Sequence, residues 1–196
     1  VTTHCYPRCV FCYNYKQPGK HARKNHIQEN LRHLKKLGVK FIDFTGGEPL
    51  LHPEIVSILT EAKKLGFRTT LTTNCIRYQN LARQLRGLVD LLHFSLDSLD
   101  EEQHNSLRGR ECFKQVTESI ELSQRLGEKP DILFTVTADN LDQLPVMACF
   151  AAEKRLMLLV NPVFSYFDNP ALTKEQLDYC LQYAGSPYVY VNRGII

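Results

Sequence analysis

Apolar residues recur along this chain at two different spacings. Ile27, Leu31, Leu34 and Leu37 fall three or four residues apart, as residues on one face of an α-helix do, and Gly38 then ends the segment. Later segments have the same spacing, and we predict further helices at about residues 53–66, 81–88, 112–126, 144–153 and 173–183. Thr173 is the expected N-cap of the last one.

Short runs rich in β-branched and aromatic residues separate these helices and predict strands. The predicted strands are residues 1–3, 39–44, 68–73, 91–96, 132–137 and 158–164. Strand and helix alternate at intervals of roughly 25–30 residues, which is typical of a parallel sheet with crossover helices. The pattern therefore predicts an α/β fold, and it leaves an open doubly wound sheet and a partial barrel as alternatives.

Polar side chains gather where these predicted strands end. In both alternative folds the functional groups lie at the carboxyl ends of the strands. The segments there are residues 4–12, 45–49, 72–74, 95–97, 135–140 and 161–162. Taken one at a time, most of these segments are also typical of ordinary turns or helix caps. Because all of them fall on one predicted edge, we expect a binding site at that edge.

The composition narrows the class of protein. The chain has 196 residues, of which 43% are hydrophobic and 23% are charged, as in an ordinary globular domain with a core. No stretch approaches the ~20 apolar residues that span a bilayer, and the first residues do not have the pattern of a signal peptide. The formal net charge of +3 gives no evidence of nucleic-acid binding. We therefore expect a cytoplasmic protein.

Seven cysteines are present, and three of them lie close together near the start of the sequence. Cys5, Cys9 and Cys12 fall within eight residues, whereas the other four are scattered singly. Such a cluster indicates metal binding rather than disulfides. A structural zinc site takes four protein ligands, so three thiols indicate a site with one open position. Two alternatives are a zinc module that adds His4 or Cys75, and an iron-sulfur electron carrier, which needs a fourth cysteine nearby.

Three sequence motifs together resemble those of the radical S-adenosylmethionine (radical SAM) superfamily. The first is Cys5-x-x-x-Cys9-x-x-Cys12, and the second is Gly-Gly-Glu-Pro at residues 46–49, after the next predicted strand. The third, FSLDSLDEEQHNSLRGRECF at residues 94–113, is similar to members that also carry a C-terminal auxiliary-cluster (SPASM-type) domain. The resemblance spans residues 2–161, and it implies a partial (βα)6 TIM-like barrel with parallel strands.

The resemblance also implies a chemistry. Cys5, Cys9 and Cys12 would be the metal ligands and catalytic residues, each holding an iron of a [4Fe-4S] cluster whose fourth iron binds SAM. Reductive cleavage of SAM would give a 5′-deoxyadenosyl radical that abstracts hydrogen from a substrate, either a peptide or a small molecule. A protein such as flavodoxin or ferredoxin would supply the electron. The barrel would take up residues 1–164, with the start of its first strand missing. Residues 165–196 would form a last helix and a truncated extension, beyond which an auxiliary cluster is expected.

Further residues are assigned to SAM by the same resemblance. Gly46, Gly47 and Glu48 would hold the methionine ammonium, Pro49 would shape the turn, and Phe11 would lie against the adenine. The remaining expectations are Ser95 at the carboxylate or ribose, Arg108 at the carboxylate, Asn74 and Asp97 at the ribose, and Thr137 or Asn161 at the adenine or ribose.

Two positions depart from the pattern of the superfamily. Cys75 stands where many members have glycine after Thr-Asn, so that a side chain is added beside the expected SAM pocket or the loop differs. Ser98 stands where glycine is common after Ser-Leu-Asp, and serine fits such a turn at modest cost.

Overall fold

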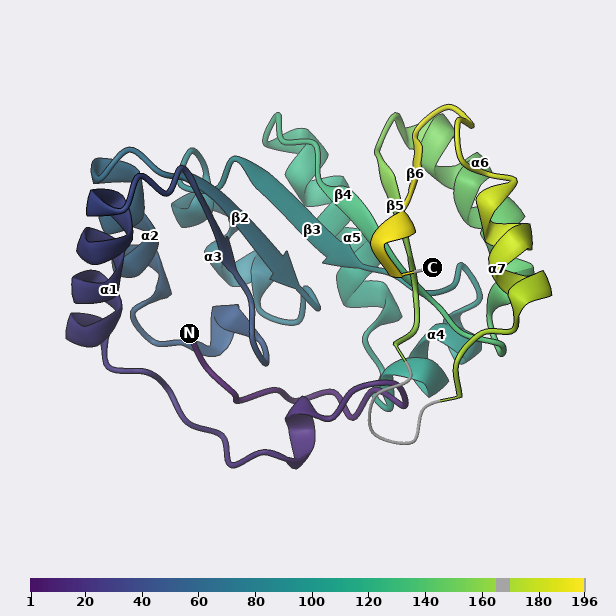
Figure 1. The fold of residues 1–196 in the computed structure, drawn as a ribbon, viewed down its shortest axis with the longest axis horizontal. Helices are drawn as coiled ribbons and strands as arrows, with labels where there is room; N and C mark the ends of the chain where they lie inside the picture. The colour runs from purple at the N-terminus through teal and green to yellow at the C-terminus, as the bar shows by residue number, and fades with distance from the viewer. Residues whose placement is uncertain (165–169, 196) are drawn as a thin grey trace.

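A computed structural model describes residues 1–164 and 170–195 of the protein, and six parallel strands form its single sheet (Figure 1). The strands lie in the order in which they occur in the sequence, as expected when each crossover connection returns to the next position in the sheet. They are β1 (Phe41–Phe44), β2 (Arg68–Thr73), β3 (Leu91–Ser95), β4 (Asp131–Val136), β5 (Leu158–Pro162) and β6 (Val189–Val191). The predicted α/β fold, a partial TIM-like barrel with parallel strands, is confirmed.

Helices alternate with the strands along the chain and cover one face of the sheet (Figure 1). They are α1 (Lys24–Lys36), α2 (Ile55–Lys64), α3 (Tyr78–Leu85), α4 (Glu101–Arg108), α5 (Phe113–Arg125), α6 (Leu144–Lys154) and α7 (Lys174–Leu181). Short 3-10 turns occur at Asn14–Lys16, Pro49–Leu51, Leu141–Gln143 and Arg193–Ile195. None of the helices in these described ranges is long and apolar enough to cross a membrane.

The two faces of the sheet differ in chemistry because strand side chains alternate between them. Leu71, Phe94 and Phe134 are fully buried in the core beneath the helices, and the Phe94 ring packs edge-on against Tyr78 at 4.6 Å between centroids. The alternate residues point to the opposite face, which we call the helix-free face. It carries Asp43, Thr70, Thr72, His93, Asp131, Leu133 and Thr135. Because the apolar residues must face the helices, the residues between them must point to the helix-free face.

One predicted strand needs correction, and two elements of the structure were not predicted. Residues 1–3 form no strand, and only Thr2 makes isolated bridges, one parallel to Gly46 and one antiparallel to His21. The sixth strand of the sheet is β6, for which we had no prediction, and helix α4 was also missed. The expected boundary between residues 164 and 165 falls at residues outside the described part and stays a prediction.

Candidate functional site

The cysteine loop is held by the two glycines that follow β1. Gly47 N–H donates to the Thr2 carbonyl at 2.8 Å, and Glu48 N–H donates to the His4 carbonyl at 2.7 Å. The backbone of the two glycines lies very close to the backbone of residues 2–4. A Cβ on Gly47 would lie 2.3 Å from the His4 carbonyl oxygen, and one on Gly46 would lie 2.4 Å from the Thr2 carbonyl oxygen. Gly46 also has a φ of 137°, which side chains disfavour. Both glycines are therefore needed to seat the segment before Cys5.

The three clustered thiols line one cavity of about 200 Å³ at the carboxyl ends of the strands. Each of them accepts an N–H hydrogen bond. Asn74 Nδ2 donates to Cys5 Sγ at 3.8 Å, and Arg108 Nη1 donates to Cys9 Sγ at 3.8 Å. The backbone N–H of Asn14 donates to Cys12 Sγ at 3.5 Å. Donors of this kind stabilise thiolates that bind metal.

The thiols need a positive partner to ionise. Burial, together with the nearby Glu48 carboxylate, raises the pKa of Cys5 to about 12, and burial also raises the pKa of Cys9. Bound iron would supply the missing charge and displace the protons. No His, Cys, Asp or Glu group in the described ranges is placed to hold a single metal ion. Thiols spread around one cavity instead fit a [4Fe-4S] cluster, in which each cysteine binds a different iron.

Glu48 joins the glycine loop to the end of β2. Its Oε1 accepts hydrogen bonds from Leu50 N–H at 3.0 Å and from Thr73 Oγ1 at 2.8 Å, while Oε2 accepts from Asn74 N–H at 2.7 Å. The side chain is 2% exposed, and this burial raises its pKa to about 7 despite the three donors. Glu48 therefore positions Asn74, the donor to Cys5, and it also lines the cavity.

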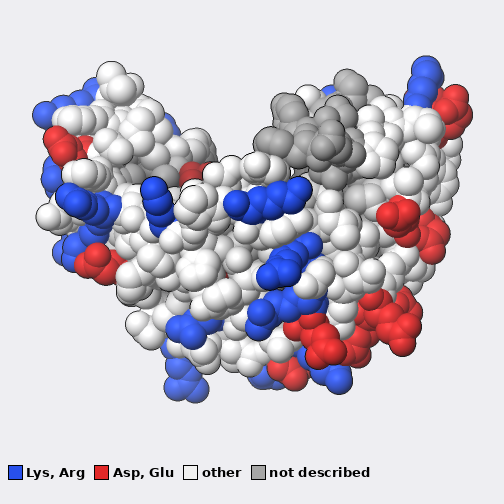
Figure 2. Space-filling model, turned by 90° about the horizontal axis from the view of Figure 1, so that it is seen from below, with Lys and Arg blue, Asp and Glu red and all other residues white. Residues whose placement is uncertain are grey.

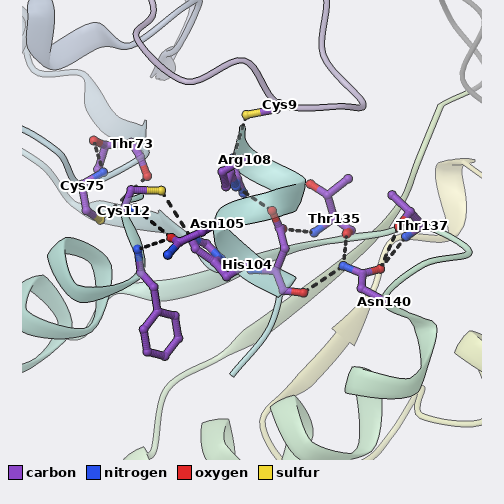
Figure 3. A network of polar contacts seen from close by, with 12 residues as sticks. Cys9, Thr73, Cys75, His104, Asn105, Arg108, Cys112, Thr135, Thr137 and Asn140 are labelled. Carbon is purple, nitrogen blue, oxygen red and sulfur yellow. Dashed lines mark hydrogen bonds and ion pairs between the residues drawn. The ribbon is translucent and has the colours of Figure 1, made fainter. Parts of the chain in front are cut away.

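Arg108 enters the cavity from the C-terminal end of α4. Its Nε lies 2.6 Å from Asp97 Oδ2, and its guanidinium carbon lies 5.3 Å from the centre of the Phe11 ring. Figure 3 shows that Arg108 lies between Cys9 and the network that includes Thr135 and Asn140. Among the described residues, Arg108 Nη2 is buried and has no hydrogen-bond partner. A buried cationic donor that lines a cavity fits an anionic group there, such as the carboxylate of SAM.

The structure brings most of the predicted site residues together. Those that line the cavity are Cys5, Cys9, Phe11, Cys12, Gly46, Gly47, Glu48, Asn74, Ser95 and Arg108. Four predicted residues do not line it. Pro49 is buried at the start of a 3-10 turn, and Asp97 faces Arg108. Thr137 bonds to Asn140, and Asn161 Oδ1 accepts from Asn192 Nδ2 at 2.9 Å.

The cavity is also lined by residues for which the sequence predicts no role in ligand binding. Thr72, Thr73 and Thr135 lie in the polar segments that follow the predicted strands, but no ligand role was assigned to them. Asn14 is a cavity residue that we did not predict. Its Nδ2 donates to the Gly46 carbonyl at 2.7 Å, so that it joins the cysteine loop to the glycine loop. Its position two residues after Cys12 is the feature that would have identified it.

Cys75 lies in the hydrophobic core and not on the cavity wall. Its side chain is fully buried, and its backbone has a φ of 65°, the left-handed conformation that glycine favours. This conformation agrees with the glycine that many members have at the position, and here a cysteine adopts it. The thiol contacts the Thr73 carbonyl at 3.9 Å rather than facing Cys5. Cys75 is therefore not placed as a fourth ligand, which removes one form of the zinc alternative.

Comparisons with known proteins place the chain in a family. A model of the Radical SAM superfamily matches residues 1–148. The GTP 3',8-cyclase of Chlorobaculum tepidum is 36% identical over 129 residues, which are 62% of this chain and 38% of that protein. SuiB of Streptococcus suis bound to S-adenosylmethionine matches with a TM-score of 0.81 and 20% identity over 97% of this chain and 48% of its own. SuiB bound to precursor peptide SuiA gives a TM-score of 0.84 and 19% identity, with 97% and 47% covered.

The chain spans less than half the length of each of these proteins. The likeness to the SuiB structures shows the fold alone. The match to the Radical SAM family model is the finding that indicates radical chemistry with SAM. The expected cofactors, a [4Fe-4S] cluster and SAM, are confirmed for the family, as is the expectation of an enzyme. Because the family model covers well over half of the chain and the sheet agrees with it, this chain belongs to the Radical SAM superfamily.

Proposed function

We propose that this chain forms the catalytic barrel of a radical SAM enzyme, in which Cys5, Cys9 and Cys12 hold a [4Fe-4S] cluster. When bound, the reduced cluster supplies the electron that cleaves SAM to methionine and a 5′-deoxyadenosyl radical, which abstracts hydrogen from a substrate. The observation that carries this proposal is the convergence of three donor-supported thiols on one cavity at the strand ends. The buried guanidinium of Arg108 and the buried carboxyl of Glu48 line the same cavity.

The cavity walls suggest how SAM is oriented. The free Nη2 of Arg108 suits the methionine carboxylate, and Phe11 beside it suits the adenine. The glycine loop and Glu48 suit the ammonium, because Glu48 Oε2 uses one hydrogen bond and retains capacity for another. Pro49 holds this turn from outside the cavity. Ser95 and Asn74 line the wall nearest to the ends of β3 and β2, where we place the ribose.

Three other expected SAM contacts lie behind the cavity wall. Asp97 is fully buried against Arg108, so we propose that it acts through that residue and not on the ribose. Thr137 and Asn161 stay proposals for the adenine or ribose, although each is bonded to another asparagine side chain. Polar atoms already satisfied in this way are weaker candidates than the free Arg108 nitrogen.

The helix-free face of the sheet borders the cavity and is where we propose that the substrate lies. Within the six described strands the acids are Asp43 and Asp131, and Arg68 is the one Lys or Arg. Asp131 Oδ2 lies 3.4 Å from His93 Nε2 on this face. Arg68 alternates with Thr70 and Thr72 and lies on the same face, so the strands contribute two carboxylates and one guanidinium there. A nucleoside triphosphate would meet a net negative charge, which disfavours it. The charge balance supports a neutral or cationic substrate, such as a peptide segment, even though matched relatives are named GTP 3',8-cyclase.

An electron donor is the other partner that this chemistry requires. Figure 2 shows the molecule from below, the side on which the cysteine loop lies in Figure 1; Lys and Arg side chains run across the middle of that face, and Asp and Glu gather at its lower right. Arg8, Lys16, Lys20 and Arg110 are exposed in and around the loop. Such a surface complements an acidic protein, so we propose that a flavodoxin or ferredoxin supplies the electron there.

The test is an anaerobic reconstitution with iron and sulfide, followed by reduction and addition of SAM. We expect a [4Fe-4S] absorption band and formation of 5′-deoxyadenosine. Cys9→Ala should abolish deoxyadenosine formation, whereas Cys149→Ala, which removes an exposed cysteine, should leave it unchanged. Bound zinc without deoxyadenosine would contradict the proposal and favour a structural metal site. Stimulation of deoxyadenosine formation by GTP, but not by lysine-containing peptides, would contradict the proposed substrate class.

A further inference from the structure

The three thiols of the cysteine loop receive donors that differ in charge. Cys5 accepts from a side-chain amide and Cys12 from a backbone N–H, and both of these donors are neutral. Cys9 accepts from Arg108, which carries a full positive charge. Hydrogen bonds to cluster sulfurs, and charges near them, are among the features that set the reduction potential of an iron-sulfur cluster. Arg108 is therefore the one charged group among the described donors to these three thiols.

The end of α4 is fixed on the cysteine loop by backbone contacts as well. Val10 N–H donates to the Leu107 carbonyl at 2.9 Å. Gly109 caps the helix with a φ of 60°, and a Cβ there would lie 2.5 Å from the Arg8 carbonyl oxygen. The residues on either side of Arg108 thus contact the residues on either side of Cys9. The main chain of Arg108 has little freedom to move away from that thiol.

Asp97 fixes the side chain of Arg108 in turn. Its Oδ2 faces Arg108 Nε at 2.6 Å, and its Oδ1 accepts from Thr135 N–H at 3.0 Å. Its main chain is held too, because Asp97 N–H donates to His104 Nδ1 at 3.2 Å and Asn140 Nδ2 donates to the Asp97 carbonyl at 2.9 Å. Figure 3 shows this network around the end of α4. Asp97 itself is fully buried.

The planar guanidinium then divides its donors among three directions. Nε faces Asp97, Nη1 faces Cys9 Sγ, and Nη2 is left for the cavity. A lysine ammonium is a single point charge and cannot hold these three positions together.

We propose that Asp97 is a positioning residue of the cluster site, which acts through Arg108 to hold a charged hydrogen-bond donor on Cys9 and thereby raises the reduction potential of the cluster. This inference rests on the proposed function, since it requires the three cysteines to hold the cluster.

A double-mutant cycle tests the proposal with a spectroscopic readout. Asp97→Asn, Arg108→Met and the double variant are reconstituted anaerobically, iron and sulfide are counted, and the midpoint potential is measured by redox titration followed by electron paramagnetic resonance. We expect Arg108→Met to retain iron and to shift the potential to a more negative value, because the charged donor to Cys9 is lost. Asp97→Asn should shift the potential to a more negative value in the presence of Arg108 and have little effect in the Arg108→Met background. A shift to a more positive value would be the direct effect of removing the Asp97 charge and would overturn the proposal.

The matched control is Asp100→Asn, which makes the same chemical change on the exposed N-cap of the same helix and should leave the potential unchanged. Additive shifts, or no shift in Asp97→Asn, would overturn the proposal. If Arg108→Met fails to fold because Asp97 is left unpaired in the core, Arg108→Lys takes its place and an unchanged potential overturns the proposal. Absence of a cluster signal in the unmodified protein would instead contradict the proposed function.

Discussion

Gly47 is the position at which a single methyl group should disable the site. A Cβ added there would lie 2.3 Å from the His4 carbonyl oxygen, whereas such contacts are essentially never closer than 3.0 Å. The two backbones must therefore separate by at least the difference of 0.7 Å. His4 precedes Cys5, and Glu48 N–H donates to the same His4 carbonyl, so the displacement reaches a cluster ligand and the Glu48 loop together. A misplacement of about 1 Å in an active site lowers rates about a hundredfold.

The assay compares Gly47→Ala with the unmodified protein after identical anaerobic reconstitution. We expect iron content to fall and SAM-dependent deoxyadenosine formation to fall about a hundredfold. Gly38→Ala is the control, because Gly38 follows the end of α1 and has a φ of 81°, but nothing lies within 4 Å of its added Cβ. That variant should lose about 1 kcal/mol of stability and keep both cluster and activity. Wild-type iron content and activity in Gly47→Ala would refute the steric argument.

Further predictions concern buried groups. Cys75→Gly should leave iron content unchanged and lower the free energy of unfolding by about 1 kcal/mol. The core loses a buried thiol, which costs more than is gained by relieving the backbone at a φ of 65°. Loss of iron would make Cys75 part of the metal site. Burial and the nearby Arg108 lower the pKa of His104 to about 3, so the protein loses stability as the pH falls from 6.5 towards 3. In urea titrations, His104→Asn should therefore gain about 2 kcal/mol relative to wild type between pH 7.5 and pH 5, and the exposed-site control His26→Asn should not. Burial raises the pKa of Glu48 to about 7, so the wild-type protein loses stability as the pH rises from 4.5 to 7, and Glu48→Gln should gain stability relative to wild type between pH 5 and pH 8. Parallel pH dependences in all four proteins would contradict both assignments.

The fold was predictable because its elements have strong local signals. The helix-facing residues of the central strands, such as Leu71 and Phe134, are apolar and alternate with more polar neighbours, and the helices between them repeat at helical spacing. Two elements lacked such signals. Helix α4 has Leu107 as its single large apolar residue, and strand β6 is three residues long and preceded by Tyr188 at a φ of 61°. Short or polar elements depend on contacts made elsewhere in the chain.

The candidate site was predictable in part for a related reason. The thiols, the two glycines and Glu48 are close in sequence or follow strands, and parallel strands bring their carboxyl ends to one edge. Their cavity follows from topology. Which polar residues face that cavity and which lie behind it depends on side-chain partners, and Asn161 was expected at SAM although its Oδ1 accepts from Asn192 on the next strand segment.

Asp97 and Arg108 show most clearly where sequence reasoning ends. Both were expected to contact SAM, and a motif alone does not indicate which of two charged residues reaches the ligand and which supports the other. The structure separates them by burial. Asp97 is fully buried, its Oδ1 accepts from Thr135 N–H, and its Oδ2 forms an ion pair with Arg108 Nε, whereas Arg108 Nη2 is buried with no hydrogen-bond partner among the described residues. An unpaired buried donor costs free energy unless a ligand satisfies it, so the free nitrogen identifies Arg108 as the residue for the ligand and leaves Asp97 as its support.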